Sequence, residues 1–236
     1  MTRQMVDAAG AAVNALARVA RPVILTEFRR DSCIASTRIG IDALAYFGVS
    51  AIPVPLRVWV FNQRVLELVE QGASMDQIGE LVRGVQSDAL GGPWSMMIGA
   101  KVDGSDGWAG HLMIGLPCFH TLVDLSIDQA SRPRKDLVFD EPLVFSLPKD
   151  EWWAAREKKH VHVGHRAGSR AVLVLDRDVP DADGFRASPN WRRRSSSSCG
   201  KEAFKRVTGE VIRLMKRELA EHEAGPQLAR TRDRRR

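Results

Sequence analysis

Apolar residues in the first part of the chain lie three or four positions apart, at Met5, Ala9, Val13 and Leu16. This spacing predicts a helix over residues 3–20 that ends before Pro22. A second helix is expected from about residue 33 to residue 47, because Asp31 and Ser32 directly before it are suitable N-cap residues.

Runs of β-branched and aromatic residues follow, and they predict strands at 51–61, 94–102, 108–116, 119–127, 137–147 and 171–175. The turn residues at 103–107 predict a hairpin between the second and the third of these strands. Helical patterns also occur at 63–71, at 75–83 with Ser74 as N-cap, and at 201–222. Helices that come first and an antiparallel sheet that follows define the α+β fold class.

Charge is distributed unevenly along the 236 residues. Residues 186–236 carry a net charge of +9, whereas the preceding residues carry −3 and the whole chain carries +6. We therefore expect a domain at 1–185, an Arg/Ser-rich linker at 186–200, and a basic helix with a disordered tail at 201–236. The basic segment could bind nucleic acid or an acidic partner, but a solvated helix with a frayed end is the simpler interpretation.

Composition excludes several classes of protein. Three cysteines cannot form the complete disulfide framework of a small secreted domain. The longest apolar stretch, residues 43–56, contains glycine and proline and is shorter than the ~20 residues that a membrane span needs. The N-terminal alanine-rich run is interrupted by Asp7, Asn14 and Arg18, unlike a signal peptide. We expect a soluble, cytoplasmic protein without membrane association.

Cys33 stands at the predicted start of the second helix. Free N–H groups and the helix dipole favour an anion at that position, and a nucleophile there can use its own N–H as an oxyanion donor. The small residues Ser36, Thr37 and Gly40 share its helix face, which suggests a thiol that faces a cleft. Free cysteines are also common as small core residues, so Cys33 alone supports both interpretations.

His111 and Asp124 lie on two consecutive predicted strands. If these strands pair around a four-residue loop at 116–119, the two residues are directly opposed on one face of the sheet. A carboxylate beside one ring nitrogen fixes the histidine tautomer and leaves the other nitrogen to accept a thiol proton. Asp124 stands between two apolar residues and therefore calls for a partner, unless its strand is an edge facing water. Asp128 is the alternative orienter if the register slips.

A helix-borne Cys33, a strand-borne His111 and Asp124 on the next strand occur in an order that resembles a known family. It is the transglutaminase-like branch of the papain-like cysteine fold, which includes the arylamine N-acetyltransferases. The resemblance covers roughly residues 25–147. It implies a papain-like core in which Cys33 is the acyl-accepting nucleophile, His111 the general base and Asp124 the residue that orients it.

Two positions depart from the usual pattern of that family. Ile34 follows the cysteine where transglutaminases usually have tryptophan, and Leu112-Met113 follows the histidine where Ala-Trp is usual. These departures leave the subfamily and the acyl donor open.

Other chemistry-bearing residues suit simpler roles. His160, His162 and His165 have basic neighbours but no nearby cysteine or carboxylate, which favours a solvated segment over a zinc site. Cys118 and His120 are too few for a metal site, and we expect Cys118 in a turn or in the core. We expect no metal and no cofactor.

Two tryptophans and the third cysteine remain to be considered. Trp94 and Trp108 could form a cleft wall, although aromatic residues on strands are commonly core residues. Cys199, beside the serine run, is expected to be exposed and unstructured.

Three hypotheses follow from the sequence. The first is a cysteine acyl-transfer enzyme that hydrolyses an amide or peptide, as a thiol protease does, or passes the acyl group to an amine. The second is a catalytically inactive papain-like domain used for binding. The third is a nucleic-acid-binding protein that acts through Arg192–Arg194 and the terminal arginines. The substrate, the acyl acceptor and the oligomeric state do not follow from the sequence.

Overall fold

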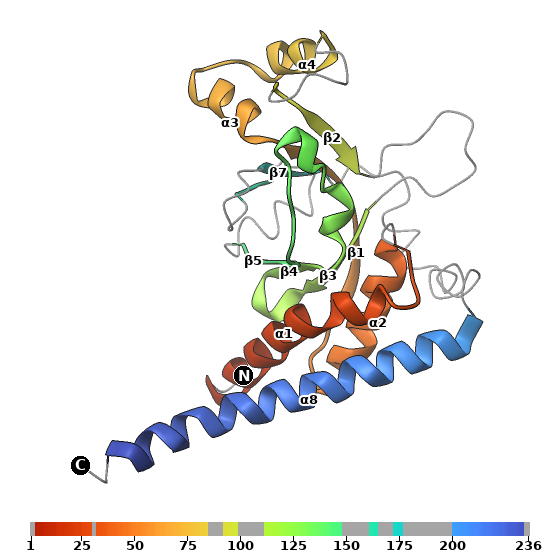
Figure 1. Cartoon of the computed structure of the whole chain (residues 1–236), viewed down its shortest axis with the longest axis vertical. Helices are drawn as coiled ribbons and strands as arrows, with labels where there is room; N and C mark the ends of the chain where they lie inside the picture. Colours follow the sequence, from red (N-terminus) through yellow and green to blue (C-terminus); the bar gives the residue numbers. More distant parts are fainter. Residues whose placement is uncertain are drawn as a thin grey trace.

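The computed structural model describes residues 3–29, 32–84, 92–98, 111–147, 161–164, 172–176 and 200–233. These residues form helices and an antiparallel sheet, so the α+β class is confirmed. Three helices pack against one another along one side of the sheet: α1 (Arg3–Ile24), α2 (Cys33–Tyr46) and α8 (Gly200–Asp233) (Figure 1). Helices α3 (Gln63–Glu70) and α4 (Met75–Gly84) lie at the opposite end of the molecule from α8.

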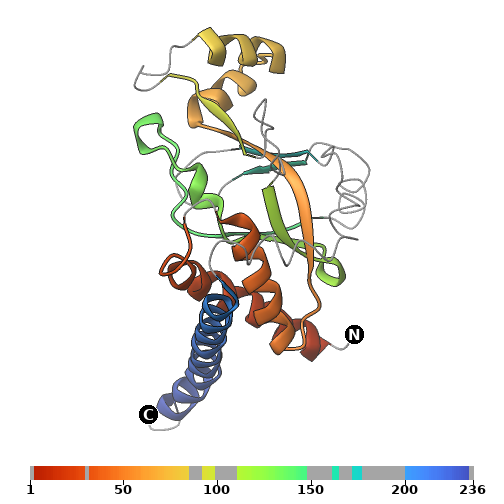
Figure 2. The ribbon, with the colours of Figure 1, turned by 90° about the vertical axis from the view of Figure 1, so that its right-hand side faces the viewer.

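The strands of the described residues are β1 (Ile52–Phe61), β2 (Ser95–Ile98), β3 (His111–Leu116), β4 (Thr121–Asp124), β5 (Leu143–Ser146), β6 (Val161–Gly164) and β7 (Val172–Asp176). Their order is β5-β4-β3-β1-β7-β6, with β2 also paired to β1, and every pairing is antiparallel. The long β1 runs from the helices toward α3, as Figure 2 shows. Its first half pairs with β3 and its second half with β2 and β7.

Two buried clusters cover the region around β3 and β4. One lies among α1, α2, α8 and the sheet, and it includes Leu16, Leu44, Ile114 and Val211. The other includes Met113 of β3, and it is completed by residues such as Val58, Ile127 and Phe139. Neighbouring side chains of β3 enter different clusters because side chains alternate between the two faces of a strand. Strand β3 is therefore packed on both of its faces.

The predicted helices are found with shifts of a few residues at their ends, and α4 begins with a reciprocal cap. The Ser74 hydroxyl accepts from the N–H of Gln77 (3.3 Å), and the Gln77 side chain accepts from the N–H of Ser74 (2.8 Å). The predicted end of α1 was wrong, because the helix continues through Pro22 to Ile24. Proline removes a single hydrogen-bond donor near this helix end, while Ile24 and Phe28 are buried in the core and hold the chain there.

The predicted hairpin between the strands that became β2 and β3 was also wrong. In the described residues both strands pair with β1, β2 along residues 58–61 and β3 along residues 52–56. The other edge of β3 pairs with β4. The intended turn at 103–107 lies outside the described residues. Alternating patterns predict strands, but they do not identify which strand lies alongside.

Helix α8 extends the predicted C-terminal helix from Gly200 to Asp233, so residues 230–233 of the expected disordered tail are helical. The first half of α8 contributes Phe204, Val207, Val211 and Met215 to the same cluster as α1 and α2. An apolar stripe within a basic segment therefore packs α8 onto the domain. The predicted linker at 186–200 lies outside the described residues except for Gly200.

Candidate active site

Cys33 is the first residue of α2, and its side chain is partly exposed. Ser32 occupies the N-cap position but makes no side-chain cap; its hydroxyl instead accepts from Arg21 Nη1 at 3.5 Å. Thr37, one turn further on, donates its hydroxyl to the backbone carbonyl of Leu112 at 2.9 Å. These contacts fix the N-terminal turn of α2 against the start of β3, next to His111.

Close packing along α2 strengthens this placement. Gly40 lies where an added Cβ would overlap the side chains of Ile114 and Leu125, both of which are buried. The helix therefore lies close to β3 and to the end of β4, and a larger residue at position 40 would require the ends of these two side chains to move. The sequence suggests that the small residues on this face of α2 border a cleft. One of them, Gly40, allows the helix to pack closely on the sheet.

His111 and Asp124 are brought together, but in a different register from the one predicted. The strands pair Ile114 with Val123 and Leu116 with Thr121, which moves the partner of each residue by two positions. The loop is accordingly 117–120, and His120 takes the left-handed conformation that closes it (φ 49°). A shift of two preserves the face of every side chain, so His111 and Asp124 become diagonal neighbours instead of direct opposites.

The contact between the two side chains is short and completely buried. Nε2 of His111 lies 2.6 Å from Oδ2 of Asp124, and both side chains have no solvent exposure. Burial, the largest influence, lowers the pKa of His111. The charge and hydrogen bond of Asp124 and then the contacts with Cys33 outweigh it and raise this pKa from 6.5 to about 10. An imidazolium at His111 is therefore favoured at neutral pH.

Cys33 is among the groups that raise the pKa of His111, through a hydrogen bond and its charge, so the thiol lies close to the imidazole. Nε2 of His111 faces Asp124, so a proton from the thiol can be accepted only at Nδ1, the nitrogen that Gln129 also contacts. The helix start, β3 and β4 thus bring Cys33, His111 and Asp124 into one contiguous group.

Ser126 and Gln129, which the sequence analysis did not select, complete the surroundings of His111. The second carboxylate oxygen of Asp124 accepts from the N–H of Ser126 at 2.8 Å and from its hydroxyl at 3.2 Å. Gln129, in the short helix η2 (Ile127–Ala130), places Nε2 at 3.1 Å from Nδ1 of His111. The same Nε2 donates to the Ser126 hydroxyl at 3.5 Å. Four side chains therefore form a closed ring of hydrogen bonds.

Asp128, the alternative orienter, has another partner. Arg21 Nη2 of α1 lies 2.7 Å from Oδ1 of Asp128, and both residues are buried. Nη1 of Arg21 donates to the Ser36 hydroxyl at 3.2 Å and to Ser32 at 3.5 Å. This ion pair joins α1, the start of α2 and η2, so it links the element that carries the thiol to the element that carries Gln129.

A cavity of about 580 Å³ adjoins this ion pair on the side of α1. Its lining includes Arg21, Leu25, Leu125, Asp128 and Phe139. The volume is that of a typical small-molecule pocket. Cys33, His111 and Asp124 are not among its lining residues; the cavity is linked to the start of α2 through Arg21, which donates to Ser36.

Among the residues that the structure describes, the other candidates are not assembled into a second site. Cys118 is exposed in the turn before β4, and Trp94 is partly buried against a core cluster. His160, His165, Trp108 and Cys199 lie outside the described residues, whereas His162 is on β6. In the described part of the chain, no group of three or more histidine, cysteine or carboxylate side chains could hold a metal ion.

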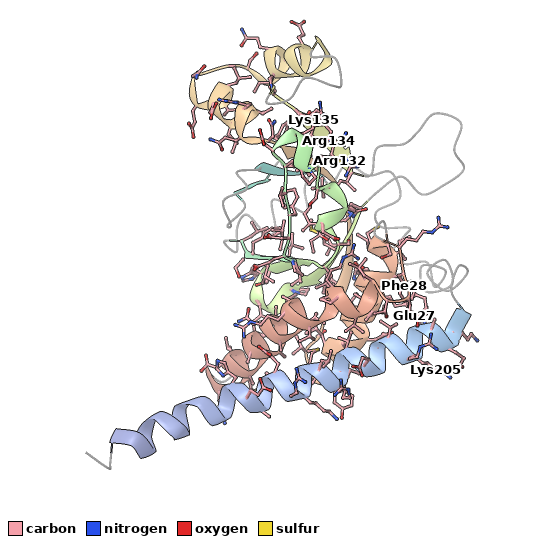
Figure 3. All side chains as sticks on the ribbon, in the orientation of Figure 1. Glu27, Phe28, Arg132, Arg134, Lys135 and Lys205 are labelled. Carbon is pink, nitrogen blue, oxygen red and sulfur yellow. The ribbon has the colours of Figure 1, made fainter. Side chains whose placement is uncertain are left out.

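Charged residues of α8 form ion pairs with α1 and with the segment that follows α1. Arg206 contacts Glu27 (2.6 Å), and Glu218 contacts Arg18 of α1 (2.6 Å). Glu27 and Phe28 lie beside the first turns of α8, close to Lys205, as Figure 3 shows. A second basic group, Arg132, Arg134 and Lys135, lies at the other end of the sheet in the same view.

Comparisons of the chain with family models, with curated proteins and with solved structures give no match. No helix among the described residues combines the length and the apolar character that crossing a membrane requires. What the candidate site does is therefore argued from its own geometry.

Local signals for the additional residues exist in the sequence. Asp124-Leu125-Ser126 is a short acidic-x-serine segment that can form a side-chain-to-backbone turn, which the structure contains. Arg21 follows Ala20 and precedes Ile24 on the buried side of α1, and a charge there demands a partner. Gln129 has no such signal, because its contact depends on the path of the chain after β4.

Proposed function

We propose that the protein is a cysteine-nucleophile acyl-transfer enzyme, an amide or peptide hydrolase or a transglutaminase-like acyltransferase. The observation that carries this proposal is the fully buried hydrogen bond of 2.6 Å between His111 and Asp124. The Cys33 side chain also interacts with this imidazole and raises its pKa. Burying an ion pair costs desolvation free energy unless both groups also have good hydrogen-bond geometry. Groups with strongly perturbed pKa values are concentrated at functional sites.

In the first half of the reaction, Cys33 has given its proton to Nδ1 of His111, and the thiolate of this ion pair attacks the carbonyl carbon of the substrate. The backbone N–H groups at the start of α2 are oriented to stabilise the resulting oxyanion. His111 then gives the proton to the leaving amine, and a thioester forms on Cys33. Asp124 accepts from Nε2–H throughout, which holds the ring and stabilises the imidazolium.

In the second half, His111 removes a proton from water or from an acceptor amine, which attacks the thioester. The tetrahedral intermediate expels the Cys33 sulfur, and the sulfur recovers its proton from His111. Water yields a hydrolase and an amine yields a transferase. The two outcomes differ in what the site admits, and the same three side chains serve both.

The proposal includes the papain-like, transglutaminase-like core that the order of the three residues resembles. Support for it comes from the position of Cys33 at a helix start and from the antiparallel neighbours β3 and β4 that carry His111 and Asp124.

Alkylation of each cysteine by iodoacetamide across a range of pH tests the proposal. Trypsin releases Cys33 in peptide 31–38, while Cys118 and Cys199 fall in other peptides. Because the reactive form is the thiolate, we expect Cys33 to react faster at pH 6 than a free thiol with a pKa of ~8.5 would. His111→Ala removes this advantage.

Cys118 is the internal control, since it is exposed and its reactivity should not respond to the His111 substitution. A Cys33 that reacts no faster than Cys118 at pH 6, or that is indifferent to His111→Ala, contradicts the enzyme proposal. That result would instead favour the inactive binding domain.

A further inference from the structure

Gln129 occupies the one ring nitrogen of His111 that the thiol needs. Nε2 of His111 faces Asp124 at 2.6 Å, so the proton of Cys33 can be accepted only at Nδ1. The Gln129 amide nitrogen lies 3.1 Å from that same atom. An amide N–H can donate to Nδ1 only while Nδ1 carries no proton.

The amide of Gln129 is held in this donating orientation by its other contact. Its Nε2 also donates to the Ser126 hydroxyl, whose single proton is donated to Oδ1 of Asp124. Turning the amide around would place its carbonyl oxygen against a hydroxyl with no proton left to donate. The backbone of Gln129 has a further contact, because Arg132 Nη1 donates to its carbonyl at 2.9 Å.

We propose that Gln129 is a positioning residue that favours the neutral form of the His111 ring by donating to Nδ1, and that its amide withdraws when Nδ1 takes the proton of Cys33. This inference rests on the proposed cysteine acyl-transfer function and adds a residue to it. Asp124 stabilises the imidazolium, and Gln129 opposes it by donating to the neutral ring. The two residues together bring the base closer to the intermediate proton affinity that acid–base catalysis at neutral pH requires.

The ionisable surroundings of His111 are few enough to make the effect of Gln129 measurable. Asp124 on β4 and Cys33 on α2 are the charges that act on its pKa. Asp128, next to Gln129 on η2, is paired with Arg21 of α1 at 2.7 Å. On the other neighbouring strand, β1, the residue in register with His111 is Leu56, which carries no charge.

The test compares the pH dependence of Cys33 alkylation in the full-length protein and in two variants. Gln129→Met keeps the length of the side chain without a donor, and Gln129→Asn keeps the amide but withdraws it from Nδ1. Loss of one hydrogen bond to the neutral ring should lower the midpoint of thiolate formation by about half to one pH unit. Below the midpoint, this equals an increase in alkylation rate of about threefold to tenfold.

Gln71→Met is the matched control, because Gln71 is an exposed glutamine at the end of α3, far from the site in the chain and on another element. It should leave the profile unchanged. Circular dichroism and thermal unfolding check that each variant is folded.

A second measurement reads the proton on His111 without the thiol. Nitrogen-15 NMR of Cys33→Ala protein, with and without Gln129→Met, follows the titration of the His111 ring. We expect the titration midpoint of His111 to rise by about half to one pH unit when the donor is removed.

An alkylation profile that is unchanged, or moved to higher pH, in both Gln129 variants overturns the inference. The proposed function fails separately, if wild-type Cys33 shows no advantage over Cys118 and no response to His111→Ala. A wild-type advantage combined with silent Gln129 variants would therefore reject the role of Gln129 alone.

Discussion

The buried His111–Asp124 pair should make the stability of the protein depend on pH in a defined direction. In the folded state the pKa of His111 is about 10, whereas an unpaired histidine has a pKa of 6.5. Its contribution to stability is therefore fully present below pH 6.5 and is lost as the pH rises toward 10. Between these limits the free energy of unfolding falls by about 1.4 kcal/mol per pH unit, or about 3 kcal/mol from pH 7 to pH 9.

Asp124→Asn removes the main attraction for the proton, whereas burial continues to disfavour the imidazolium. The variant should therefore show no such loss between pH 7 and pH 9. Urea unfolding of the two proteins at pH 7, 8 and 9 measures the difference between their free energies of unfolding, and groups common to both cancel. Both carry Cys33→Ala, so that the thiol does not titrate; because Cys33 contributes to the raised pKa of His111, about 3 kcal/mol is the upper value expected in this background. A difference that stays constant across this range would refute the protonated, Asp124-paired state of His111.

Further predictions concern packing and the second ion pair, all measured by urea unfolding. Gly40→Ala should destabilise the protein by about 1–3 kcal/mol because its methyl group overlaps buried side chains, whereas Gly10→Ala, with open space around it, should stabilise α1 by up to about 1 kcal/mol. Arg21→Met should cost about 3–5 kcal/mol because it removes the arginine that faces the buried carboxylate of Asp128, and adding Asp128→Leu should recover most of this loss. Phe204→Ala should cost about 3–5 kcal/mol if α8 is part of the core; a cost below 1 kcal/mol would mean that α8 is dispensable.

Local patterns were sufficient to predict α2, β1, α3 and α4, because caps, apolar spacing and β-branched residues act over a few neighbouring positions. The end of α1 could not be predicted from Pro22, since burial of Ile24 and Phe28 outweighs the loss of one hydrogen bond. Strand partners were likewise out of reach. Which strand pairs with β1 depends on long-range packing that alternation does not encode.

The candidate triad was accessible to sequence reasoning for a specific reason. Side chains alternate with a period of two, so the error of two positions in the register left His111 and Asp124 on one face. An error of one would have separated them. Arg21 and Gln129 reach the site through tertiary contacts, and the sequence contains no periodic pattern that would have placed them there.

Formation of a thioester on Cys33 is the most direct test of the central claim. The full-length protein is mixed with p-nitrophenyl acetate, quenched in acid, digested, and peptide 31–38 is examined by mass spectrometry for an acetyl group. We expect acetylation of Cys33 that turns over, and a decrease in its rate of about 100-fold or more in His111→Ala. Absence of the acetyl group from Cys33, or equal labelling of Cys118, would contradict the proposed chemistry.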